Sequence, residues 1–146
     1  MFPSPTLRRI GALSTMCVLL TLAACGGGGS ESNLEIGVVV AGQPVAGGTI
    51  QPGATRTITI SAGQSLELDA NEPVDWTLEV GGTAITGNST VYYGGVSFTV
   101  TSVSSSRIVL DTTAPYPLAA PVSVSLTAVS SIDSAVVASA DILVTN

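Results

Sequence analysis

The sequence predicts an all-β fold for residues 34–146, an antiparallel β-sandwich of about seven to nine strands. Apolar and polar residues alternate over short runs, which is the pattern of a strand with one buried face. Clusters of Gly, Pro and Asn separate these runs, and β-branched residues, which favour strands over helices, are plentiful. No helix is predicted outside the N-terminal segment.

Five runs carry the alternation most clearly. Each places its apolar side chains on one face and Ser, Thr, Asp or Glu on the other: residues 57–60, 65–70, 75–80, 96–101 and 122–128. Turn-forming sequences lie between them, among them Gln51-Pro52-Gly53, Asn71-Glu72-Pro73, Gly81-Gly82 and Gly94-Gly95. One-sided strands bury their apolar faces by packing two sheets together, so a sandwich is expected.

Residues 1–24 have the layout of a secretory signal peptide. Arg8 and Arg9 precede an apolar run at residues 10–22, interrupted by Gly, Ser and Thr alone. A membrane-spanning helix needs about 20 apolar residues, so this run is too short for one. The residues after Arg8-Arg9 fit a twin-arginine signal poorly, and general secretion is favoured.

The end of this segment, Leu22-Ala23-Ala24-Cys25, resembles the lipobox of bacterial lipoproteins. The resemblance implies cleavage before Cys25, a diacylglyceryl thioether on Cys25 and acylation of the new amino group. Several acyl chains together anchor a protein stably to a membrane. Gly26 follows the cysteine where an inner-membrane retention signal has Asp, which implies outer-membrane localisation with the periplasmic or exterior orientation left open.

The sequence after the signal divides into a tether and one domain. Residues 25–33 are expected to form the lipidated cysteine and a flexible Gly/Ser linker, and residues 34–146 are long enough for one core. A phosphate-binding loop would need a lysine, and the chain contains none. Cys17 leaves with the signal and Cys25 is lipidated, so no disulfide forms within one mature chain.

The charge of the predicted mature protein restricts its partners. Two cations, Arg56 and Arg107, stand against ten acids, which gives a net side-chain charge of −8. Such a surface repels nucleic acid and anionic headgroups. The expected partners are therefore the membrane, through the lipid, and an unknown protein or envelope component.

Two regions resemble bacterial immunoglobulin-like domains. Residues 121–144 combine an alternating Val/Ser strand, a turn with Asp133, a small-residue patch and a Val-rich final strand. Residues 74–82 resemble the central strand of these domains, with its single Trp76 and following glycines. The resemblance implies an immunoglobulin-like β-sandwich without the cysteine pair of antibody domains.

The residues for enzyme chemistry are scarce. The chain has no His and no Lys, and the predicted mature form has no free Cys, which removes the usual general base and nucleophiles. The neighbouring acids Glu67 with Asp69, and Asp75 with Glu79, are expected on solvated outer strand faces. We therefore predict no catalytic residues and no bound cofactor beyond the covalent lipid.

Ca²⁺ is the cofactor that a cluster of acidic residues in this sequence could bind. Asp69, Asn71, Glu72 and Asp75 fall within seven residues around a predicted turn, and Ca²⁺ prefers carboxylate and carbonyl oxygens. Their spacing does not match the twelve-residue calcium loop. A metal-free acidic turn is thus the favoured interpretation, with these four residues as weak Ca²⁺ candidates.

The aromatic residues are expected to be structural. Trp76 shares its strand face with Leu78 and Val80, which predicts a core position. Tyr92 and Tyr93 are adjacent, so in a strand one points inward and the other outward. Tyr116, between two prolines, is expected to pack as a corner tyrosine whose hydroxyl bonds the backbone.

Two functions of different class follow. The leading hypothesis is a lipid-anchored, non-catalytic immunoglobulin-like module that contacts a protein or envelope partner. The alternative is a surface adhesive domain that binds carbohydrate or acts with Ca²⁺. Exposed tyrosines or converging carboxylates would favour the alternative, whereas a hydrolase would need a concave pocket holding two carboxylates.

Overall fold

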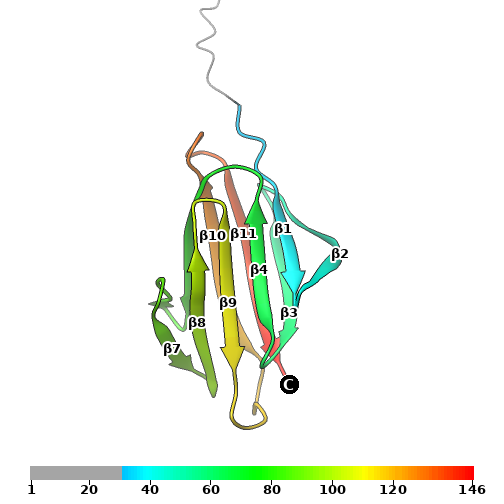
Figure 1. The fold of residues 1–146 in the computed structure, drawn as a ribbon, viewed down its shortest axis with the longest axis vertical. Helices are drawn as coiled ribbons and strands as arrows, with labels where there is room; N and C mark the ends of the chain where they lie inside the picture. The colour runs from blue at the N-terminus through cyan, green and yellow to red at the C-terminus, as the bar shows by residue number, and fades with distance from the viewer. Residues whose placement is uncertain (1–30) are drawn as a thin grey trace, which may run out of the picture.

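The computed structural model describes residues 31–146, and these form strands and no helix (Figure 1). The predicted signal peptide, Cys25 and residues 26–30 lie outside the described residues. Within residues 31–146 no helix is long and apolar enough to cross a membrane. The eleven strands are β1 (Ile36–Val40), β2 (Gln43–Ile50), β3 (Thr55–Ser61), β4 (Ser65–Ala70), β5 (Val74–Val80), β6 (Thr83–Ala84), β7 (Thr90–Tyr93), β8 (Val96–Val103), β9 (Arg107–Thr113), β10 (Val122–Ser130) and β11 (Val137–Thr145).

The strands make two sheets that pack face to face (Figure 1). Sheet A has the order β2-β1-β4-β9-β8-β7, and sheet B has the order β3-β11-β10-β5-β6. Every neighbouring pair is antiparallel except β3 and β11, which run parallel with Ile58 opposite Ile142. This arrangement is an immunoglobulin-like β-sandwich, and it confirms the predicted fold class.

The structure has eleven strands, more than the seven to nine expected, because three of them lack the alternation of apolar and polar residues. β6 has two residues and β7 has four, and most of their side chains are exposed. β2 is exposed over most of its length, and only Gly48 and Ile50, near its C-terminal end, are buried. Strands that bury little carry no apolar period, so they cannot be recognised from the sequence.

The core lies between the sheets and consists of the apolar faces that the alternation predicts. In β10, Val122, Val124 and Leu126 are buried while Ser123 and Ser125 are exposed. Phe98 of β8 is fully buried, with a relative exposure of 0%. No buried side-chain polar atom of the described residues lacks a hydrogen-bond partner.

β2, an edge strand of sheet A, contains a bulge. The pairing of β1 with β2 shifts register between Gly37 and Val39, so residues 45–48 protrude from the ladder. The Arg56 guanidinium of β3 donates hydrogen bonds to the carbonyl oxygens of Gly47 and Thr49 on β2. Arg56 thereby links sheet B to sheet A across this edge.

The loops gather at two ends of the sandwich (Figure 1). The N-terminal end holds residues 31–35 and the loops at 71–73, 104–106 and 131–136. The far end holds the turns at 81–82 and 94–95 and the loop at 114–121. The chain enters the domain at the N-terminal end, so the far end is the part of the domain most distant from residue 31.

Candidate functional site

The N-terminal end is organised by Asn71 and Glu72, in the turn between β4 and β5. The Glu72 carboxylate accepts hydrogen bonds from the Ser32 hydroxyl and the Asn33 amide, the latter at 3.2 Å, and from the Ser130 hydroxyl. The Asn71 side chain donates to the Asn33 carbonyl oxygen at 2.8 Å and accepts from the Glu35 amide at 2.9 Å. Ser32 and Asn33, predicted as part of the flexible linker, are therefore hydrogen-bonded to the domain.

These hydrogen bonds change the acidity of Glu72. The hydroxyl donors Ser130 and then Ser32, together with the Asn33 amide, favour the ionised carboxylate and hold the pKa of Glu72 below its usual 4.5. A carboxylate with a lowered folded-state pKa stabilises the fold above its unfolded-state pKa. This contribution is lost as the pH falls through the folded-state pKa.

We expect Glu72→Gln to weaken the acid sensitivity of the fold. Urea unfolding of the wild-type chain and of Glu72→Gln, compared over the range from about pH 6 to about pH 2, should show a steeper loss of stability in the wild type. Glu79→Gln on the exposed outer side of β5 is the matched control and should keep the wild-type slope. Equal slopes for all three chains would contradict the assignment of Glu72 as the joint between the N-terminal segment and the domain.

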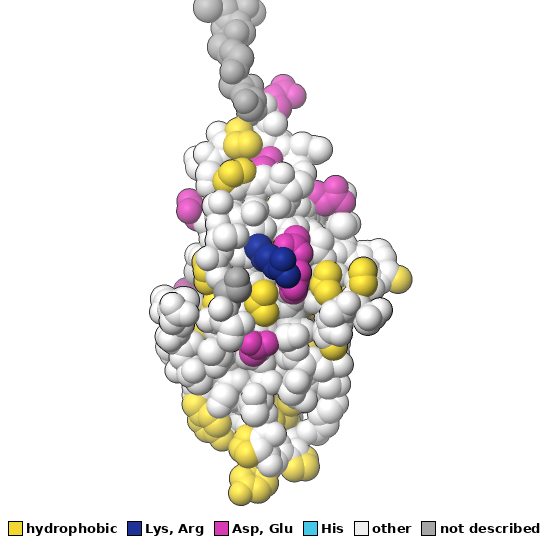
Figure 2. All heavy atoms as spheres, in the orientation of Figure 1, with side chains coloured by type: hydrophobic (Ala, Val, Ile, Leu, Met, Phe, Trp, Pro, Cys, Tyr) yellow, Lys and Arg dark blue, Asp and Glu magenta, His cyan; other side chains and the backbone are white. Residues whose placement is uncertain are grey.

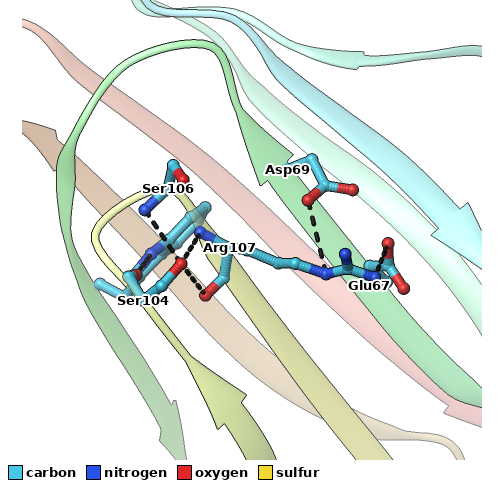
Figure 3. Close-up of polar contacts among 6 residues, drawn as sticks. Glu67, Asp69, Ser104, Ser106 and Arg107 are labelled. Carbon is cyan, nitrogen blue, oxygen red and sulfur yellow. Dashed lines mark hydrogen bonds and ion pairs between the residues drawn. The ribbon is translucent and has the colours of Figure 1, made fainter.

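A charged cluster occupies the outer face of sheet A (Figure 3). The Arg107 guanidinium pairs with Glu67 through Nη2, and its Nε lies 3.6 Å from Oδ1 of Asp69. Arg107 lowers the pKa of Glu67 by its hydrogen bond, whereas burial and then the hydrogen bond with Glu67 raise the pKa of Asp69. Because the Arg107 side chain is half exposed, solvent screens this cluster and it contributes little to stability.

The four calcium candidates are divided by the fold. Asn71 and Glu72 lie together but are bonded to the N-terminal segment, while Asp69 faces Arg107 on the outer side of sheet A. Asp75 is exposed on β5, in the opposite sheet. The turn between β4 and β5 crosses from one sheet to the other, which separates residues that are close in sequence. Within residues 31–146, no three residues among His, Cys, Asp and Glu are placed to hold a metal ion.

Trp76 lies at the margin of the core, and it is partly buried against the core residues. Its indole Nε1 donates a hydrogen bond to the Ser104 carbonyl oxygen at 3.0 Å, which joins β5 of sheet B to the turn between β8 and β9 of sheet A. A hollow of about 290 Å³ opens beside it where β6 leaves β5. Apolar side chains line most of this hollow, including Trp76, Leu78, Ile85, Val100, Val103 and Ile108.

Tyr93 pairs with the buried Val96 and Tyr92 pairs with Ser97, so Tyr93 points inward and Tyr92 outward as expected, although neither ring is buried. Tyr116 is exposed, so the expectation that it packs as a corner tyrosine is wrong. The exposed fractions are 66% for Tyr92, 48% for Tyr93 and 79% for Tyr116. β7 is an edge strand of sheet A, and its last residue, Tyr93, lies at the far end with no further strand beside it. Alternation sets the direction of a side chain but requires a packed partner for burial, and β7 lacks one there.

The Tyr93 ring packs against the turn between β5 and β6. Gly81 in this turn has a φ of +56°, and a Cβ built on it would lie 2.6 Å from Cζ of Tyr93. The glycine therefore makes room for the tyrosine ring as well as permitting the left-handed backbone. In the sequence, the pair Gly81-Gly82 predicts a turn, and the contact with Tyr93 is a second reason for glycine at position 81.

The far end carries a second hollow, of about 420 Å³. The turn at 94–95 packs closely on the start of β10, because a Cβ on Gly94 would lie 2.6 Å from Cγ2 of Val122. Figure 2 shows hydrophobic side chains gathered at this end of the domain. The hollow is lined by Gly81, Tyr93, Gly94, Ala119, Ala120, Pro121, Val122 and Ser123.

Neither hollow is lined by a carboxylate. Comparison of the chain with protein-family models, curated proteins and solved structures gives no match. The arrangement of the chain's own residues must therefore carry any assignment of function.

Proposed function

We propose that this protein is an outer-membrane lipoprotein whose immunoglobulin-like domain is a non-catalytic module that contacts a protein or envelope partner. The observation that carries the proposal is the position of Cys25, directly after a thirteen-residue apolar run that ends at Leu22 and the two small residues Ala23-Ala24. The glycines at 26–29 then supply a tether between a lipid on Cys25 and the domain.

The geometry of the domain fits such an anchor. Asn71 and Glu72 hold Asn33 and Ser32 at the N-terminal end, so a tether joined to residue 31 approaches the domain from that end. The far end then faces away from the membrane. This orientation leaves its loops free to meet a partner.

Contact is the favoured mode of action because the side chains for chemistry are lacking. Residues 31–146 contain no His, Lys or Cys, and their two arginines, Arg56 and Arg107, are both engaged in intramolecular contacts. The paired acids Glu67 and Asp69 lie on an outer sheet face and share Arg107. Binding through surface loops needs none of these groups.

We expect Cys25→Ser to release the protein from the membrane. The serine hydroxyl cannot form the thioether, so the acyl chains that hold the protein to the bilayer are not attached. Membrane fractionation, with metabolic labelling by radioactive palmitate, should find the wild-type chain labelled and in the membrane fraction. The Cys25→Ser chain should be unlabelled and soluble.

Cys17→Ser is the matched control, because Cys17 lies inside the apolar run of the predicted signal. This variant should be labelled and fractionate like the wild type. Retention of the Cys25→Ser chain in the membrane fraction would overturn the anchor.

A second function is favoured by the exposed tyrosines, namely a surface adhesive domain that binds carbohydrate. Tyr93 combines an accessible ring with an adjoining hollow, which is the feature that this alternative requires. A Ca²⁺-dependent form of this function is less favoured, because Asp69 and Asp75 lie on opposite sheets.

A further inference from the structure

We propose that the far end of the domain is a binding site for an uncharged saccharide, with Tyr93 as the side chain on which a sugar ring packs. The inference deepens the proposed function by naming the chemical class of the partner. The inference rests on the proposed function in one respect: the lipid anchor at the N-terminal end directs the far end away from the membrane.

The site is assembled from three segments that are distant in sequence. The turn at 81–82 meets the Tyr93 ring, and the turn at 94–95 meets the segment that begins β10. Gly95 also approaches Leu118, whose Cδ2 would lie 3.6 Å from a Cβ at that position. The hollow of about 420 Å³ lies where these segments join, with Tyr93 as its aromatic member.

Tyr93 is both held in place and accessible. Its ring packs on Gly81, and 48% of the residue is nevertheless exposed. An aromatic side chain that is already ordered loses little conformational entropy when a ligand packs on it. The Tyr93 ring is thus preorganised to pack against a flat ligand.

The electrostatics of the far end select against charged ligands. Residues 80–106 and 112–132 contain no Asp, Glu, Lys or Arg, so all three of its segments are uncharged. The domain as a whole is acidic, which repels anionic glycans. A cationic ligand would find no carboxylate lining the hollow.

The hydrogen-bonding groups at the far end suit a ligand rich in hydroxyls. Gly81, Gly94, Ala119 and Ala120 lie outside the strands, and they line the hollow together with Ser123, whose side chain carries a hydroxyl. A sugar ring offers a C–H face to an aromatic ring and hydroxyls to such polar groups at its rim. Sites of this type combine an apolar surface with a few polar groups that fix orientation.

The test is direct binding of the full chain, purified in detergent, to immobilised oligosaccharides. The probes are neutral pentasaccharides of glucose, galactose, mannose and N-acetylglucosamine, with pentasaccharides of galacturonic acid as the charged comparison. The wild-type chain should bind at least one neutral probe and not the uronic acid probe. Tyr93→Ala should weaken that binding about tenfold or more, and Tyr93→Phe should retain most of it.

Tyr92→Ala is the matched control, because Tyr92 is exposed on the same strand but does not line the hollow. It should bind as the wild type does, and circular dichroism should show that both alanine variants are folded. No binding to any neutral probe, or equal binding by wild type and Tyr93→Ala, would overturn the inference. Binding of a protein partner alone that depends on Tyr93 would also overturn it. The assay uses no membrane, so its failure leaves the Cys25 anchor to be judged by fractionation.

Discussion

Replacement of Phe98 by alanine is expected to lower the free energy of unfolding by about 3–5 kcal/mol. Phe98 is fully buried in β8, between its neighbours β7 and β9. Removal of the ring loses apolar burial and leaves a cavity that a sandwich of two sheets can close only in part.

This loss is large relative to the total free energy of unfolding expected for the domain. Single domains are stable by about 5–15 kcal/mol, and residues 31–146 contain no cysteine that could add a disulfide. Urea denaturation followed by circular dichroism measures the change, with Phe98→Leu as the control at less than about 1.5 kcal/mol. A Phe98→Ala chain as stable as Phe98→Leu would show that Phe98 does not support the core as described.

Gly48→Ala is expected to destabilise the domain by about 1–3 kcal/mol, the range for a side chain forced into an occupied space. A Cβ at Gly48 would overlap the carbonyl oxygen of Val45 and lie 2.8 Å from its Cβ. The obstacle is mainly backbone, so relief requires the β2 bulge to open. That opening would also displace the Gly47 carbonyl oxygen, which accepts from Arg56.

Gly37→Ala supplies the control for this prediction. Gly37 lies in the neighbouring strand β1, and a Cβ there would make an ordinary contact of 3.6 Å with the Asp69 carbonyl oxygen. Neither glycine has a positive φ, so the two substitutions differ in the space available. Gly37→Ala should be neutral or stabilise by about 0.4–1 kcal/mol, because alanine restricts the unfolded chain. Thermal unfolding separates the two, and equal melting temperatures would refute the steric account of Gly48.

The strands that build the core could be predicted because burial on one face imposes a period of two. Ile58, Val124 and Leu126 lie on the apolar faces that this period predicts, and all three are buried. β6 and β7 escaped prediction because their side chains are mostly exposed and no apolar period marks them. The parallel pairing of β3 with β11 escaped it as well, since alternation carries no information about strand direction.

The candidate sites were less predictable, because they depend on contacts between distant segments. Glu72 was a calcium candidate by sequence proximity to Asp69, yet its hydrogen-bond partners Ser32 and Ser130 stand 40 and 58 residues away. Tyr93 was expected to be structural, like the other aromatic residues. Its exposure follows from its place at the end of an edge strand, which only the sheet order reveals.

The sequence by itself determined the all-β class, the buried faces of the main strands and the scarcity of catalytic side chains, because composition and short-range periodicity reflect burial directly. Tertiary structure alone decided which acids share a partner, where β2 bulges and which tyrosine borders a hollow. Those features arise where β4 pairs with β9, where β1 pairs with β2 and where three segments meet at the far end. Such long-range encounters leave no local pattern in the chain.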